Sequence, residues 1–480
     1  TEKWTQSQQE AVYSFHLPEG GVVSSLSLWI NGVEEKSRLS ARSLADSAYR
    51  TVVGQERRDP SIVHWQEGNL ITLRVFPCTP QEARRFKLGV TAPMTLSNEE
   101  LVLENVVFEG PDASKAREAI VVTLPDAQNL WHNAPDFLTK KEQGSWQGQR
   151  TYKPDFTLRL PVPPVSKTTF RFMGNSYVAQ PAAPRMENFH PRTLYLDLHK
   201  GWSEKEIKEM LDLAATLHLP VRVWYEGEWF DPHALSGYAA TLVLRKNHFS
   251  MMPFHLIPDY NAALVVTKSA GATPTLDDLR ESRFATEAQK FFSHQSAPLR
   301  CWHVGDDLTH YLRSLRELRL LRVETGDWAT LRTLLSRQQF YAPAESADTV
   351  CIASSRMCIV RATDTTATRA QGNDHLMRLF VYHDVMRRIG AQYWSRRYEP
   401  GSLVQRAEEG FVVTPVSSLV VLESQKDYDR FGISANQNTL GNAAIGQKGA
   451  VPEPHEWALL LLLVAGLWWY RKRGQLAVSD

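Results

Sequence analysis

The residues best suited to chemistry are a cysteine and a histidine two positions apart, in Cys301-Trp302-His303. They belong to an apolar run, 299–304, and active sites of α/β proteins gather at strand ends. A thiol next to an imidazole could act as a nucleophile. However, alternate residues of a strand need not touch, and the sequence offers no third partner. Because phosphate-loop, dinucleotide, zinc-protease and serine-hydrolase motifs are also absent from the sequence, we expect a protein that is not an enzyme.

The four cysteines are Cys78, Cys301, Cys351 and Cys358, and their spacing does not match that of a metal site. We expect them to be unpaired, half-buried thiols. A disulfide between Cys351 and Cys358 is the alternative if the compartment is oxidising. The formal net charge of +1 gives no electrostatic basis for binding nucleic acid. No motif indicates a cofactor.

The segment around Cys301 alternates between strand-like and helix-like patterns. Apolar runs at 193–198 and 220–225 flank a helical pattern that opens with the capping box Ser203-Glu204-Lys205-Glu206. Further strands are expected at 241–244, 263–267 and 299–304. This order implies a parallel sheet with right-handed crossovers. We therefore predict a doubly wound α/β domain at 186–345.

The N-terminal part has the patterns of β structure. Apolar residues alternate along 23–30, and Asn31-Gly32 has the composition of a hairpin turn. A short helix is expected at 40–49. We predict a β-rich domain at 1–185.

The stretch 10–95 resembles the VIT domain, the β-rich module of inter-alpha-trypsin inhibitor heavy chains and vault-associated proteins. The residues that carry the resemblance are Glu10-Ala11-Val12-Tyr13, Phe15-His16-Leu17-Pro18, Leu28-Trp29-Ile30-Asn31-Gly32, 45–49 and Gln55-Glu56. The family's usual Pro-Gly-Glu turn is replaced by Thr79-Pro80-Gln81-Glu82. The resemblance implies a β-sandwich.

By its position and the order of its elements, the α/β region resembles the von Willebrand factor A domain that follows VIT domains. Such domains bind Mg²⁺ with an Asp-x-Ser-x-Ser loop after the first strand and an Asp of a Thr-Asp-Gly loop after a later strand. These residues supply the hard oxygen ligands that Mg²⁺ requires. Here the first loop reads Asp197-Leu198-His199-Lys200-Gly201, and the later loop reads Val266-Thr267-Lys268-Ser269.

His199 and Gly201 therefore replace the two serines, and Lys268 stands where the second Asp is expected. An ammonium group repels a divalent cation, so we predict a degenerate site that binds no metal. We also expect Asp197 to pair with Lys268 in an internal salt bridge.

Residues 346–433 are predicted to hold a long amphipathic helix and a last strand. Apolar residues lie at helical spacing along 376–389. The stretch that follows resembles the C-terminal end of bacterial VIT/von Willebrand A proteins, in which a helix leads into a Val-Thr-Pro-x-Ser-Ser strand, here Val413-Thr414-Pro415-Val416-Ser417-Ser418. We expect a strand at 419–422 that returns to the β-rich domain and completes the fold.

A flexible spacer, 434–450, is expected to precede an apolar tail, 451–480. From Trp457 to Tyr470, 14 residues carry no charge, and the cations Arg471, Lys472 and Arg473 follow. A helix of that length spans roughly 21 Å, against about 30 Å for a bilayer core. We predict a short transmembrane helix whose cationic end lies on the cytoplasmic side.

Pro452-Glu453-Pro454, the apolar run and the basic cluster together resemble the PEP-CTERM sorting tail of Gram-negative bacteria. The resemblance implies recognition of Pro452, Glu453 and Pro454 by an exosortase, a membrane processing enzyme, with cleavage there. The two prolines keep this segment extended, as a protease groove requires.

We therefore expect a non-enzymatic, exported protein of the inner membrane, with a single C-terminal span and its globular part on the periplasmic or extracellular side. Processing would release it or attach it to the surface. Its partners would be an exosortase-type enzyme, the membrane, and a protein or glycan of the envelope. Two alternatives remain open, a resident membrane component of the sorting system and a metal-dependent adhesin with atypical ligands. Because the sequence starts at Thr1 without an apolar leader, an export signal is expected upstream.

Overall fold

The structure is a computed structural model that describes residues 8–434, with gaps at 80–82, 110–114, 125–134, 142–144, 155, 184, 270, 306, 343–344, 347, 363–373 and 396–400. The predicted sorting tail and all but the first residue of the predicted spacer lie outside these ranges. Within them, no helix is both long and apolar enough to cross a bilayer.

An antiparallel sheet of six strands forms the centre of the N-terminal region, in the order β10-β1-β6-β5-β27-β4. Its strands are β1 (Gln9–His16), β4 (Arg38–Ala41), β5 (Ser61–Gln66), β6 (Leu70–Cys78), β10 (Val107–Glu109) and β27 (Ser417–Val421). β27 comes from the far end of the chain and pairs with both β4 and β5. A strand was predicted at 419–422, so the pattern located this element to within two residues at its start and one at its end.

Alternate residues of β27 face two cores. Leu419 and Val421 belong to the largest core, which includes β2 and α8 (His375–Ile389), whereas Val420 packs with α1 (Arg42–Thr51) and α10 (Gln425–Arg430). This alternation follows from the two-residue period of a strand that is covered on both faces. The helix expected at 40–49 is α1.

Further antiparallel sheets surround this centre. β2 (Val22–Ile30) pairs with β3 (Val33–Lys36) and β7 (Phe86–Thr91). Asn31 and Gly32 both have positive φ, as the predicted hairpin turn requires. The remaining strands are β8 (Thr95–Ser97), β9 (Glu100–Glu104), β11 (Arg117–Thr123), β12 (Thr139–Lys140), β13 (Ser145–Thr151), β14 (Thr157–Pro161), β15 (Thr169–Phe172), β16 (Asn175–Pro181), β25 (Thr349–Ile352) and β26 (Met357–Arg361).

A disulfide joins Cys351 and Cys358, which are direct partners across the β25–β26 hairpin. The expectation that these two thiols are unpaired was therefore wrong. Hairpin pairing brings their Cα atoms to 4.0 Å, and the sequence spacing of seven did not reveal that register. Cys78 and Cys301 are free.

The second six-stranded sheet has the order β20-β19-β18-β21-β22-β23. Its strands are β18 (Thr193–Leu196), β19 (Val221–Tyr225), β20 (Glu228–Phe230), β21 (Ala263–Lys268), β22 (Leu299–Val304) and β23 (Leu321–Gly326). Numbered along the chain, the order is 3-2-1-4-5-6, the doubly wound arrangement. Every neighbouring pair is parallel except that of β20, which is antiparallel. The predicted parallel sheet is present.

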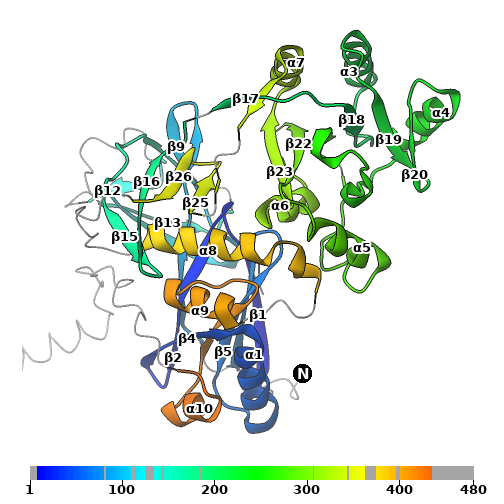
Figure 1. Cartoon of the computed structure of the whole chain (residues 1–480). Coiled ribbons are helices and arrows are strands. Elements are labelled where there is room, and N and C mark those ends of the chain that lie inside the picture. Colours follow the sequence, from blue (N-terminus) through cyan, green and yellow to red (C-terminus); the bar gives the residue numbers. More distant parts are fainter. Residues whose placement is uncertain are drawn as a thin grey trace, which may run out of the picture. The chain divides into compact units, whose positions relative to one another are not determined.

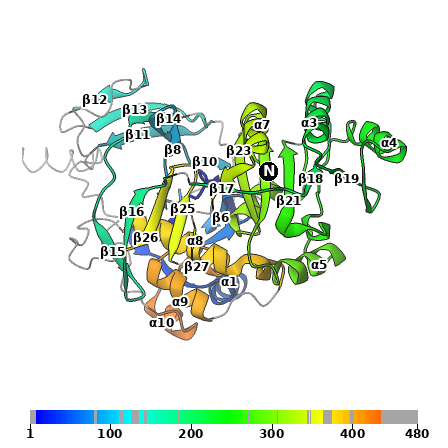
Figure 2. The ribbon, with the colours of Figure 1, turned by 45° about the horizontal axis from the view of Figure 1, so that its top comes forward.

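Helices cover both faces of this sheet (Figures 1 and 2). The helices α3 (Glu204–Thr216) and α7 (Trp328–Arg337) pack on one face, and α5 (Arg283–Phe292) and α6 (His310–Glu317) pack on the other. α4 (Leu235–Leu244) lies beside β19 and β20. The prediction of a strand at 241–244 was wrong, because this apolar run is the last turn of α4. A separate pair of short strands, β17 (Met186–Asn188) and β24 (Gln339–Tyr341), is antiparallel.

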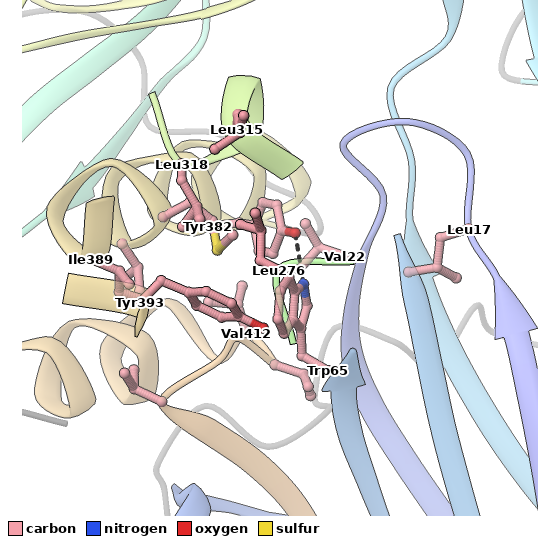
Figure 3. Packing of buried hydrophobic residues seen from close by; sticks show 14 of the residues in the cluster. Leu17, Val22, Trp65, Leu276, Leu315, Leu318, Tyr382, Ile389, Tyr393 and Val412 are labelled. Atoms are coloured by element: carbon pink, nitrogen blue, oxygen red, sulfur yellow. Dashed lines mark hydrogen bonds between the residues drawn. The ribbon is translucent and has the colours of Figure 1, made fainter. Parts of the chain in front are cut away.

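Helix α8 connects the two sheets. The sequence predicted an amphipathic helix, but α8 is buried on nearly all sides. Figure 3 shows Tyr382 and Ile389 of α8 among Trp65 of β5 and Leu315 of α6. α9 (Gly401–Gly410) packs beside α8. One continuous apolar core thus joins the antiparallel sheet to one face of the α/β sheet. Short helical turns complete the described fold: Val52–Glu56, Phe254–Leu256, Tyr260–Ala262 and Gly390–Trp394.

Candidate functional site

The carboxyl ends of the parallel strands bring together residues that lie far apart in the sequence. Asp197 directly follows β18, and Lys268 ends β21. Loops that follow parallel strands meet at one edge of the sheet, where ligands bind in this class of fold. We call this group the strand-end site: Asp197, His199, Gly201, Glu206, Ser250 and Lys268.

Asp197 is half-buried among the loops. The Ser250 hydroxyl group lies 2.7 Å from each of its two oxygens and donates to them. Burial raises the pKa of the Asp197 carboxyl group. The backbone is held as well, because the indole N–H of Trp202 donates to the Asp197 carbonyl at 2.7 Å. The side chain therefore points into the protein and has a neutral hydroxyl group as its partner.

His199 links the first loop to the later loop. Its side chain is fully buried. The Gly201 N–H donates to Nδ1 at 3.0 Å, so Nε2 carries the proton and donates to the Lys268 carbonyl oxygen at 3.0 Å. A Cβ atom at Gly201 would lie 2.5 Å from the Ser269 carbonyl oxygen and 2.7 Å from the imidazole ring. The later loop and the ring together therefore occupy the space that a larger residue at 201 would need.

Lys268 does not form the salt bridge expected with Asp197. Its Nζ lies 2.8 Å and 2.9 Å from the two carboxylate oxygens of Glu206, in the first turn of α3. The hydrogen bond from Lys268 and the contacts with Ser203 lower the pKa of Glu206, against the effect of burial, which raises it. Glu206 also accepts the Ser203 N–H at 2.9 Å, so the predicted capping box is present. The Lys268 ammonium group thus binds Glu206, whereas the Asp197 carboxylate is bound by Ser250.

Cys301 and His303 do not form a nucleophile pair. Burial raises the pKa of the Cys301 thiol to about 12. Burial also lowers the pKa of His303 to about 4, and its two ring nitrogens lie 3.0 Å from the Thr267 hydroxyl oxygen and 3.0 Å from the Asp307 carbonyl oxygen. A buried neutral thiol and a neutral, hydrogen-bonded imidazole lack the activated form that catalysis needs.

The donor set does not fit a divalent cation. Among the residues that the structure describes, no three His, Cys, Asp or Glu side chains converge as metal ligands would. Both ring nitrogens of His199 already make hydrogen bonds. Asp197 and Ser250 supply oxygens, but this pair is short of the coordination that Mg²⁺ demands. Protein hydrogen bonds hold the described loops together at this edge.

Two members of the strand-end site were not identified from the sequence. Ser250 lies in a loop after α4, in no motif, and Glu206 was predicted only as a capping residue. The residues predicted for sorting lie outside the described ranges: Pro452, Glu453, Pro454, Trp457, Arg471, Lys472 and Arg473.

Comparison with known proteins identifies one part of the chain. The search of curated proteins found no match to the chain. Residues 2–90 match the family model of the vault protein inter-alpha-trypsin domain, named VIT. The matched stretch contains β1 to β6, α1 and most of β7, and it ends before the α/β sheet. The N-terminal part of this chain therefore carries a VIT domain, as its sequence had predicted.

Proposed function

We propose that this is a non-enzymatic, exported and membrane-associated protein whose α/β domain, similar to a von Willebrand factor A domain, binds a protein or glycan of the cell envelope without a metal ion. The observation that carries the proposal is the direct cross-linking of the strand-end loops by His199 and by the Lys268–Glu206 pair. A preformed loop surface at the carboxyl ends of parallel strands suits binding, because little ordering is required on association.

The strand order supports the likeness to the A domain. The sheet order 3-2-1-4-5-6, with an antiparallel third strand, together with helices on both faces, places the first loop and the later loop side by side. That is the arrangement the resemblance implied. Asp197 occupies the first position of the loop pattern, and the replacements at His199, Gly201 and Lys268 remove the other ligands.

The Cys351–Cys358 disulfide supports export. Structural disulfides persist in oxidising compartments and are rare in the reducing cytosol. The tail Val451–Asp480, with Pro452-Glu453-Pro454 and the basic cluster, supports delivery to a membrane and processing by an exosortase-type enzyme. Mass spectrometry of the mature C-terminus in cells tests this part. An end at or near Pro454 is expected, and an intact Arg471-Lys472-Arg473 would refute processing.

Site-specific photo-crosslinking tests the binding surface. A benzoylphenylalanine replaces Ala329, an exposed residue in the first turn of α7 at the strand-end edge, or Ser336, an exposed residue in its last turn at the opposite edge. We expect a defined adduct with an envelope component from position 329, unchanged by a metal chelator, and none from position 336. Equal labelling from both ends of the helix would contradict the proposal.

A metal-dependent adhesin with atypical ligands is the second candidate. The buried oxygen pair of Asp197 and Ser250 favours it, since both are hard donors. Chelator-sensitive adduct formation in the same experiment would favour this candidate.

A further inference from the structure

Helix α4 exposes an apolar strip to solvent. Tyr238 is 58% exposed, Leu242 is 43% exposed and Val243 is 52% exposed. The helix Leu235–Leu244 carries no charged residue. Most surface helices instead have an apolar face toward the core and charged or polar residues on the side that faces solvent. Burial of large apolar side chains is favourable at about 25 cal/mol per Å². Covering this strip would therefore be favourable.

The strip faces away from the sheet. α4 contacts β19 and the edge strand β20, so its opposite side is open (Figures 1 and 2). Lys246 follows the helix and is exposed. It lies three and four positions after Val243 and Leu242, so it extends the same face. Among the described residues, Arg245 is paired with Glu204, whereas no carboxylate within salt-bridge distance of Lys246 is described.

We infer that this surface, formed by Tyr238, Leu242, Val243 and Lys246, docks on an anionic lipid bilayer. Apolar and aromatic side chains beside a cation are the pattern of helices that lie in a membrane interface. Each lysine near an anionic membrane surface strengthens binding about fivefold. The inference rests on the proposed membrane association, and it adds which face of the α/β domain meets the membrane.

The length of the chain beyond the described residues supports a bilayer as the occupant. The 22 residues between 434 and Trp457 reach at most about 80 Å when fully extended. If the apolar run is inserted, residue 434 stays within that distance of the lipid surface, and the folded part that begins there is held close to the membrane. The weak affinity of a small patch then suffices, because tethering raises the effective concentration.

The size of the strip argues against a second copy of the chain. A stable protein interface needs about 800 Å² on each partner. The exposed side of a ten-residue helix, which is about 15 Å long, offers much less area than that. A bilayer sets no such minimum area, since it deforms around the inserted side chains. The strip is too small for a stable dimer and large enough for shallow insertion.

Photo-crosslinking in vesicles tests the inference. The 480-residue chain is reconstituted in phosphatidylcholine vesicles with or without phosphatidylglycerol, and benzoylphenylalanine replaces Tyr238 or, as a control, Val33. Val33 is an exposed residue of the β2–β3 hairpin. We expect lipid adducts at position 238 and not at position 33. With phosphatidylglycerol present, we expect about fivefold fewer adducts at position 238 when Lys246→Gln is added.

Flotation of the vesicles separates the two claims. If the chain does not float with lipid, the proposed membrane association fails, and the docking inference fails with it. If the chain floats but position 238 gives no more adducts than position 33, the docking inference is refuted and the proposed membrane association still stands. Protein–protein adducts at position 238 would instead assign the strip to a second copy and overturn the inference. Circular dichroism checks that Lys246→Gln keeps the fold.

Discussion

The two six-stranded sheets of this protein are built in opposite ways. The α/β sheet takes all its strands from one stretch, from Thr193 to Gly326, and strands consecutive in the chain are joined by helices or a short turn. The antiparallel sheet of the VIT-containing region is completed by β27, which arrives from residue 417 and lies between β4 and β5. All strands of the first sheet come from its own segment, whereas the second sheet includes a strand from the C-terminal part of the chain.

A shared core ties the two sheets together. Figure 3 shows Trp65 of β5 donating to the Tyr382 hydroxyl group at 2.9 Å. Tyr382 in turn donates to Glu317, at the end of α6. A hydrogen-bonded chain thus runs from the antiparallel sheet through α8 to the α/β domain. Because these groups are buried, a break at one of them affects both regions.

The largest expected effect comes from cavities in the two sheets. Leu419→Ala in β27 and Leu299→Ala in β22 each remove a fully buried side chain from the shared core, and each is expected to lower the free energy of unfolding by about 2–5 kcal/mol. Since one core joins the sheets, we expect both variants to shift a single unfolding transition. Urea unfolding followed by tryptophan fluorescence and circular dichroism checks this. Two transitions, each moved by one variant only, would show that the sheets unfold separately.

The link between the sheets should be sensitive to pH. Burial raises the pKa of Glu317 from 4.5 to about 7. The stabilisation from this protonated group is complete below pH 4.5 and is lost as the pH rises to about 7. The expected loss is on the order of 3 kcal/mol.

Glu317→Gln removes that titration. The difference in unfolding free energy between the variant and the natural chain should therefore change between pH 4.5 and about 7 and be constant above. Burial lowers the pKa of the neighbouring His383 to about 3, and its opposite contribution cancels in the difference. A difference that does not vary with pH would contradict the role of Glu317.

At the strand-end site, His199→Ala should cost about 1–3 kcal/mol of unfolding free energy, because it leaves the Gly201 N–H and the Lys268 carbonyl oxygen without their partner. Hydrogen exchange measured by mass spectrometry should show faster exchange in the 197–202 and 266–269 loops. Unchanged protection there would mean that His199 does not hold these loops.

The smallest effect is expected for Lys268→Met. Its pair with Glu206 is about a quarter exposed on each side, and such pairs contribute about 0–1 kcal/mol. The capping box of α3 remains, so the helix should persist. Urea titration measures both variants. If Lys268→Met lowers the free energy of unfolding more than His199→Ala does, the Lys268–Glu206 pair rather than His199 is the main link between the loops.

Local patterns predicted many elements of this fold. The capping box Ser203–Glu206, the Asn31-Gly32 turn and the returning strand near Leu419 all have signals within a few residues of themselves. Tertiary contacts decided the rest. The 241–244 run contains two β-branched residues and two leucines, yet it ends a helix, α4, that contacts β19 and β20.

The strand-end site shows the same limit. The two loops were aligned from their residues, and the structure places them together. The expected Asp197–Lys268 pair was wrong because the partners, Ser250 and Glu206, come from other elements. Nothing in the local sequence records which side of a loop a side chain will face.

Calorimetric titration of Mg²⁺ into the 480-residue chain most directly tests the claim that the strand-end surface works without a metal. We expect no saturable heat for the natural chain and a gain of Mg²⁺ affinity for the double variant His199→Ser, Lys268→Asp, which restores two oxygen ligands. Saturable Mg²⁺ binding to the natural chain that is lost in Asp197→Asn would show that this surface does hold a metal.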